Sequence, residues 1–431
     1  MECEPSNLSG NAVKPDSCDP LNHASMGQFR AWRCGVIAYG ASAAIVLIGV
    51  AFGLKFLAPW NPNHSPRRVP GTGMPFWDVF NQWDGQWYVR IAREGYSYDP
   101  NRMSAVAFFP LYPILGCDVS AVTGLDESFT LLLVAHVFLI GVCVLLGLYV
   151  RQRYPHSSQG LAVFVTLSFA LYPVTFFARM VYTESLFLFL CVLALYAMER
   201  KWPLAAIVLV IALATATRPV GVALVPPLLL HLWAERKSVW GTVGKASLLT
   251  PLAVSGLGLY IAFQSVSFAE PLAFVKTQHH WQRRPVFSTA DKAIALASLE
   301  PVWASYDKSD PFGYWRRDGE PDCPAISLRF ANPIYFVLAL ILVMTGEWMG
   351  WLSLNESLFG LAALAIPYVT TSYEQSMQSQ ARYTAVAFPI YLVMGQILVR
   401  LPRPLAFGVL AASGVLLCVY SAMFAGQYVF I

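Results

Sequence analysis

One carboxylate, Asp84, stands in the aromatic stretch 76–96 (FWDVFNQWDGQWYVRIAREGY). A carboxylate framed by aromatic side chains in a partly dry site can accept a proton from a substrate hydroxyl, so Asp84 is our candidate general base. Asp78 is the rival base, and Asp84 could equally cap a short amphipathic helix. The candidate substrate contacts beside Asp84 are Trp83, Trp87 and Tyr88.

Four further ionisable residues stand at the ends of apolar runs: Arg179, Glu184, Arg218 and Arg382. An ionisable group in such a place is costly unless it is paired or faces a polar cavity. The guanidinium fork suits phosphate because it can donate two parallel hydrogen bonds, so these four residues are candidate contacts for an anionic substrate. Each of them alone is equally compatible with a structural ion pair or with a side chain that reaches the membrane interface.

The elements that must position these residues are membrane helices. The chain has 431 residues, of which 56% are hydrophobic and only 13% charged, and its mean hydropathy is +0.52. These values are typical of an all-α polytopic membrane protein and predict the lipid bilayer as a partner. The net charge of +4 is small and scattered, so it does not indicate a nucleic-acid surface.

The cysteines do not indicate a metal site. Eight Cys occur without CxxC or Cys/His metal spacing, so we expect no metal and no cofactor. Cys117 and Cys323 both fall in segments that we place outside the membrane, and a bridge between them is possible.

Apolar runs predict about eleven transmembrane helices. They cover 34–58, 128–150, 160–178, 182–198, 203–216, 220–233, 246–266, 330–346, 351–371, 383–399 and 404–430. Residues 1–33 are polar and Pro-containing, which predicts a disordered cytoplasmic tail before one multispanning domain at 34–431.

Short basic loops such as 151–158 and 234–245 alternate along the chain and are predicted to lie in the cytoplasm. The large loops 59–127 and 267–329 then lie outside, on the same face as Asp84 and the four ionisable residues. Residues 77–94 are too short and too charged to cross a bilayer, so we expect an interfacial helix in the first outer loop.

Five segments resemble the PIG-V family, the transferases that add the second mannose to the glycosylphosphatidylinositol (GPI) core, and its bacterial relatives. They are QWDGQWYVRIAREGY at 82–96, VAFFPLYP at 106–113, YTESLF at 182–187, TRPVG at 217–221 and QARYTAVAFP at 380–389. The resemblance implies a GT-C-like fold, a polyprenyl- or dolichyl-phosphate-mannose donor and an acidic residue in the first outer loop, where Asp84 is the matching position. The TRPVG segment is closer to the bacterial branch than to the eukaryotic members.

We therefore predict a membrane mannosyltransferase that moves mannose from a lipid phosphate to a glycolipid acceptor on the extracytoplasmic or lumenal face. The membrane would be the endoplasmic reticulum in a eukaryote and the plasma membrane in a bacterium, and an accessory membrane subunit is possible. Two alternatives remain open from the sequence. One is a transporter or flippase for a lipid-linked anion, and the other is a noncatalytic subunit of a transferase complex.

Overall fold

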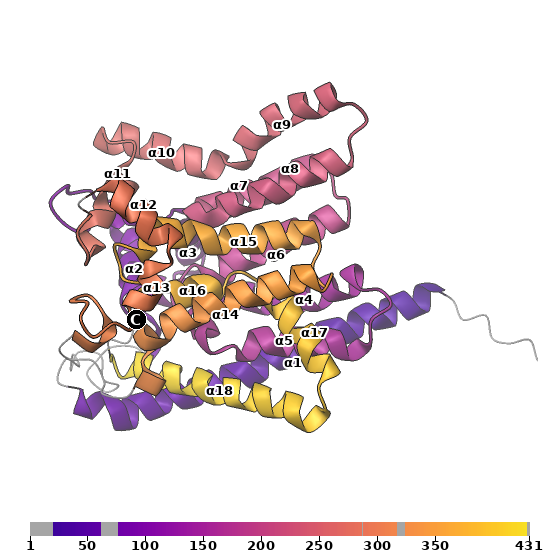
Figure 1. Cartoon of the computed structure of the whole chain (residues 1–431), viewed down its shortest axis with the longest axis horizontal. Helices are drawn as coiled ribbons and strands as arrows, with labels where there is room; N and C mark the ends of the chain where they lie inside the picture. The colour runs from indigo at the N-terminus through magenta and orange to yellow at the C-terminus, as the bar shows by residue number, and fades with distance from the viewer. Residues whose placement is uncertain (1–19, 62–75, 287, 317–323, 429–431) are drawn as a thin grey trace, which may run out of the picture.

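The computed structural model describes residues 20–61, 76–286, 288–316 and 324–428, and within these ranges it contains helices and no strand (Figure 1). The α-helices of the first half are α1 (Pro20–Phe52), α2 (Asp84–Glu94), α3 (Leu111–Thr123), α4 (Glu127–Arg153), α5 (Gln159–Leu171), α6 (Glu184–Glu199), α7 (Leu204–Thr217), α8 (Val225–Ala234) and α9 (Val239–Ala253). Those of the second half are α10 (Ser255–Phe268), α11 (Ala273–Lys276), α12 (Thr289–Ala297), α13 (Glu300–Ala304), α14 (Leu328–Trp348), α15 (Leu354–Pro367), α16 (Gln380–Thr384), α17 (Pro389–Arg400) and α18 (Arg403–Ala425).

Short 3₁₀ or π segments join or extend these helices. They are η1 (Gly53–Leu57), η2 (Ala58–Trp60), η4 (Phe76–Phe80), η5 (Ala105–Ala107), η6 (Pro173–Arg179), η7 (Pro219–Leu224), η8 (Thr277–Trp281), η9 (Tyr314–Arg316), η10 (Pro324–Ile326) and η11 (Tyr368–Ser372).

Within the part of the chain that the structure describes, four helices are long and apolar enough to cross a membrane, at 32–60, 127–153, 328–348 and 403–425. Two bent pairs raise the number to six if each pair is one span: α5 with η6, bent by 75°, and α9 with α10, bent by 51°. The chain is therefore a multi-pass membrane protein, but the expected eleven spans are not confirmed. Prolines explain part of the difference, because Pro173 and Pro219 end helices where the apolar pattern runs on.

Two expectations about the first hundred residues differ from the structure. The stretch 76–96 does not form one helix: η4 ends at Phe80, Trp83 has a positive φ of 47°, and α2 begins only at Asp84. The segment 77–94, which we expected to form an interfacial helix, is therefore not one continuous helix. Helix α1 begins at Pro20, inside the tail that we expected to be disordered up to residue 33.

Helices α1 and α18 lie side by side along one edge of the molecule (Figure 1). Gly49 and Gly53 permit this close approach, because a Cβ atom on Gly49 would lie 2.3 Å from the Cys418 carbonyl oxygen and one on Gly53 would lie 2.1 Å from that of Ala422. Small residues commonly bring membrane helices together in this way.

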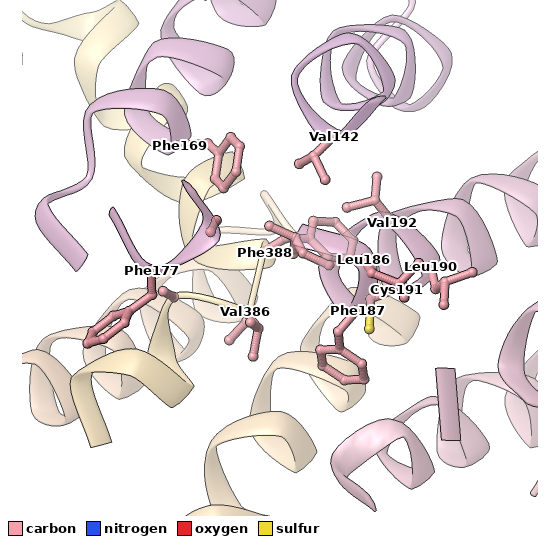
Figure 2. Close-up of a cluster of buried hydrophobic side chains, with 14 of the residues drawn as sticks. Val142, Phe169, Phe177, Leu186, Phe187, Leu190, Cys191, Val192, Val386 and Phe388 are labelled. Carbon is pink, nitrogen blue, oxygen red and sulfur yellow. The ribbon is translucent and has the colours of Figure 1, made fainter. Parts of the chain in front are cut away.

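The buried core lies between α4, α5, α6 and the segment that follows α16. Figure 2 shows side chains from these elements in one apolar cluster, among them Val142, Phe169, Leu186 and Phe388. All four are buried. The core fixes the start of α6 against the segment after α16, and the candidate site lies beside both.

Cys323 lies outside the described residues, so the possible Cys117–Cys323 bridge stays a prediction. Cys117 itself is exposed on α3.

Candidate active site

The first turn of α2 is docked on the segment between η6 and α6. The backbone N–H of Val181 donates to the Phe80 carbonyl at 3.0 Å, and the Tyr182 hydroxyl donates to the Gln82 carbonyl at 3.0 Å. Gly85 leaves room for this contact, because a Cβ atom there would lie 3.0 Å from Asn81 Oδ1 and 3.2 Å from the Val181 carbonyl oxygen. The docking brings Asp84, the first residue of α2, close to the start of α6.

A row of four alternating charges joins four elements. Arg382 contacts both Asp84 and Glu184 through its guanidinium, and Arg218 Nη1 lies 2.7 Å from Glu184 Oε1. The exposed fraction of these side chains is 3% for Glu184, 8% for Arg382, 11% for Arg218 and 33% for Asp84. Asp84 is therefore the open end of a row that is otherwise nearly buried.

Each member of the row stands where a helix begins, ends or is short. Glu184 is the first residue of α6, and Arg382 belongs to the five-residue helix α16. Arg218 caps the end of α7 with an extended backbone (φ −153°, ψ 145°), as the following Pro219 predicts. Charged side chains so placed can converge on one point without interrupting the apolar length of a helix.

Aromatic rings hold the two guanidinium groups from the side. The Arg382 guanidinium lies 4.5 Å from the ring centre of Tyr182 and 5.4 Å from that of Phe177. The Arg218 guanidinium lies 5.6 Å from the ring centre of Tyr383. Such cation–π contacts stabilise an arginine that has lost much of its water, and they fix the plane of its donors.

Arg179 is not part of this row. Its side chain is fully buried, and it donates to Ser42 Oγ on α1, to the Thr175 carbonyl at 2.9 Å and to the Ala170 carbonyl at 3.1 Å. Ala170 lies in the last turn of α5, whose carbonyl groups have no partner within the helix. Arg179 thus donates hydrogen bonds to backbone carbonyls at the α5–η6 bend. This role is structural and does not involve an anionic substrate.

The aromatic candidates beside Asp84 pack inward. The ring of Trp83 lies 4.8 Å from that of Phe424, and Trp87 stacks on Phe108 at 5.6 Å. Tyr88 is buried, and burial raises the pKa of its hydroxyl to about 12, so the phenol stays neutral at physiological pH.

Asp78 is held elsewhere than Asp84. Its Oδ1 accepts a hydrogen bond of 2.8 Å from the Ser128 hydroxyl in the first turn of α4. Among the described residues, Asp84 belongs to the charge row through its ion pair with Arg382, which also pairs with Glu184, whereas Asp78 bonds to Ser128 instead. This geometry favours Asp84 as the carboxylate of the site.

Two site residues were not predicted individually. Tyr182 and Tyr383 flank the guanidinium groups, yet in the sequence they resemble other interfacial tyrosines. The sequence feature that could have identified them is their position, since each lies within two residues of a predicted charged residue.

Residues 72–232 match the family model described as mannosyltransferase (PIG-V). Over this stretch the chain resembles the PIG-V mannosyltransferase family. Asp84, Glu184 and Arg218 lie inside the PIG-V match, whereas Arg382 lies outside it. The proteins that this family model describes are mannosyltransferases.

No curated protein matches the chain. Among solved structures, the chain is similar to the oligosaccharyltransferase of Archaeoglobus fulgidus in its apo form, with 14% identity and a TM-score of 0.43, over 90% of this chain and 56% of that one. The same enzyme tethered to an acceptor peptide gives 13% identity and a TM-score of 0.40, over 90% and 55%. The chain thus spans little more than half the length of these structures.

Proposed function

We propose that the protein transfers a mannosyl residue from a polyprenyl- or dolichyl-phosphate donor to a hydroxyl of a glycolipid acceptor, with Asp84 as the general base. The observation that supports this proposal most directly is the charge row, in which Asp84, the carboxylate with the more exposed side chain, contacts the nearly buried Arg382, and Glu184 links Arg382 to Arg218. A base open to an acceptor and a cationic wall for a phosphate are the two elements that such a transfer needs.

The reaction is a single displacement. The acceptor oxygen forms a bond to the anomeric carbon of mannose, and its proton passes to the Asp84 carboxylate. The bond between the anomeric carbon and the phosphate oxygen breaks, and the lipid phosphate leaves with the bonding electron pair. A phosphate is a good leaving group, so this step requires one carboxylate rather than the acid–base pair of a hydrolytic glycosidase.

The charges of the row match this step. Before reaction the two carboxylates balance the two guanidinium groups. When Asp84 takes the proton, the row gains one net positive charge while the departing lipid phosphate gains one negative charge. Preorganised charge of this kind stabilises the transition state more than the bound substrate.

The roles of the other residues follow from their exposure. Glu184 touches both guanidinium groups and is the most buried member, so we assign it to orienting them rather than to touching substrate. Arg218 contacts one carboxylate of the row and Arg382 contacts two, so we assign the donor phosphate to Arg218. Trp83, Trp87 and Tyr88 then frame the base.

The remaining assignments rest on the family resemblance and the positive-inside pattern. They are a site on the extracytoplasmic or lumenal face, an acceptor like that of the second mannose transfer to the GPI core, a GT-C-like arrangement, closeness to the bacterial branch and an accessory membrane subunit.

The test compares Asp84→Asn with the matched control Asp78→Asn in purified protein, using radiolabelled polyprenyl-phosphate mannose and a glycolipid acceptor. Asp84→Asn keeps the shape of the side chain and removes the base, so transfer should fall by about 10²–10⁴-fold. Asp78→Asn should retain most of the activity. If Asp84→Asn stays within threefold of an active wild type, the base assignment is wrong and another residue accepts the proton. A purified wild-type protein without any transfer activity would instead favour a noncatalytic subunit.

A further inference from the structure

A cavity of about 430 Å³ is lined by residues of the segment 284–312 and by Tyr373, and none of the four residues of the charge row lines it. Its walls include the aromatic residues Trp303 and Tyr373 and the charged residues Arg284, Glu300, Asp307 and Asp310. The volume suits one or two sugar rings, and aromatic walls with a few polar groups are typical of small-molecule sites.

One wall is a compact loop held by its own backbone. The Tyr314 N–H donates to the Ser305 carbonyl at 2.9 Å, and the Trp315 ring N–H donates to the Tyr306 carbonyl at 3.1 Å. Gly313 closes the loop, because a Cβ atom there would lie 2.7 Å from the Asp307 carbonyl oxygen. The wall is therefore formed before any ligand arrives, which lowers the entropic cost of binding.

The opposite wall is tied to the segment that carries Arg382. The Arg284 guanidinium lies 4.4 Å from the ring centre of Tyr373 and 2.7 Å from the Glu300 carboxylate. The Arg284 backbone N–H donates to the Glu374 carbonyl at 3.0 Å. Tyr373 precedes Arg382 by nine residues, so their Cα atoms are at most about 32 Å apart, within reach of a short oligosaccharide.

The charge of the cavity opposes an anion. One guanidinium stands against three carboxylates, and Arg284 is already paired with Glu300. The Asp307 carboxylate accepts hydrogen bonds from the backbone N–H and the hydroxyl of Ser309. These bonds lower the pKa of Asp307, which therefore stays ionised at neutral pH. No group of three or more His, Cys, Asp or Glu side chains that could hold a metal ion occurs among the described residues.

We propose that this cavity binds a neutral sugar ring of the acceptor glycan, distant from the hydroxyl that reacts. The proposal rests on the proposed function, because it supplies the substrate class of a second subsite for the same transfer. Trp303 offers an exposed ring face to the apolar face of a sugar, and the oxygens of Asp307 and Asp310 accept hydrogen bonds from its hydroxyls. The donor phosphate is repelled here and remains at Arg218.

The experiment measures binding without transfer. The methyl glycoside of a linear α-linked trimannoside is titrated into detergent-solubilised full-length protein, and saturation-transfer NMR gives its Kd. The Asp84→Asn variant serves as the background, so the result does not depend on catalysis. Mannose 6-phosphate and mannose are compared as the anionic and the neutral monosaccharide.

Trp303→Ala should raise the trimannoside Kd about tenfold, since it removes the stacking surface. Asp310→Asn should raise it less, and Trp348→Ala is the control, because Trp348 is 86% exposed at the far end of α14. Mannose should bind more tightly than its 6-phosphate.

Three results would overturn the subsite: no trimannoside binding to the background protein at millimolar concentration, an equal Kd for the Trp303 and Trp348 variants, or tighter binding of the phosphate. The transfer assay with Asp84→Asn tests the proposed function, and the trimannoside binding assay tests the subsite. Failure of the proposed function and failure of the subsite therefore give different results.

Discussion

Replacing Glu184 by Gln tests the central feature of the site, the shared carboxylate between two arginines. The amide keeps the shape of the side chain but removes the negative charge. Arg382 would keep its contact with Asp84, whereas Arg218, which is 11% exposed, would lose its carboxylate partner in the row. We therefore expect a loss of stability together with a loss of donor binding.

The magnitude follows from burial. Breaking a buried ion pair by removing one partner costs about 3–5 kcal/mol, and the retained Arg382–Asp84 contact puts Glu184→Gln near about 3 kcal/mol. On the per-residue scale of globular domains, 431 residues give an unfolding entropy of about 0.9 kcal/mol/K, so the melting temperature should fall by about 3 °C.

The control is Glu127→Gln. Glu127 Oε2 lies 3.0 Å from Arg93 Nε, but the two side chains are 30% and 45% exposed. An exposed pair of this kind is worth at most about 1 kcal/mol, so the control should melt within about 1 °C of wild type.

The assay combines thermal melting in detergent with the KM for the lipid-phosphate donor. Glu184→Gln should lower the melting temperature and raise the donor KM, because Arg218 is no longer oriented. If Glu184→Gln has the same melting temperature as the Glu127→Gln control and keeps the wild-type donor KM, the reasoning that Glu184 holds the two guanidinium groups in place is refuted.

Two further predictions address residues outside the row. Arg179→Ala leaves the Ala170 and Thr175 carbonyls without the Arg179 guanidinium, each at a cost of about 1–3 kcal/mol. The melting temperature should therefore fall while the KM for the sugar donor stays unchanged. A raised KM with an unchanged melting temperature would instead place Arg179 near the sugar donor. In intact cells, a membrane-impermeant maleimide should label Gln86→Cys and not Lys237→Cys, both at exposed positions, in a background that carries Cys117→Ser and Cys323→Ser. The opposite labelling pattern would reverse the predicted topology.

The sequence indicates the class of protein and most of the charged site. The apolar runs predict a helical membrane protein, since about 20 apolar residues cross a bilayer only as a helix. Asp84 stands out by its aromatic setting, and Glu184, Arg218 and Arg382 stand out because an ionisable group is expensive at the edge of an apolar run. Local steric effects also act through the sequence alone, as the extended backbone of Arg218 before Pro219 shows.

Tertiary structure decides which charges meet. Arg179 and Arg382 have equivalent sequence contexts, yet Arg382 contacts Asp84 and Glu184, whereas Arg179 turns to α1 and to the end of α5. The difference arises because the bend between α5 and η6 leaves backbone carbonyls without a partner in the helix, and the Arg179 guanidinium donates to them. Hydrophobic periodicity carries no information about which donor bonds to these carbonyls.

The same limit applies to the elements around Asp84. Hydrophobic periodicity treats residues 77–94 as one helix, because it does not register the positive φ of Trp83 that separates η4 from α2. That break lets Val181 and Tyr182 bond to the backbone of the 80–82 segment. The sequence by itself therefore determined the helical membrane class and the charged candidates. Only the folded chain decided their pairing, because contacts between residues 34 to 298 positions apart depend on how the broken helices pack.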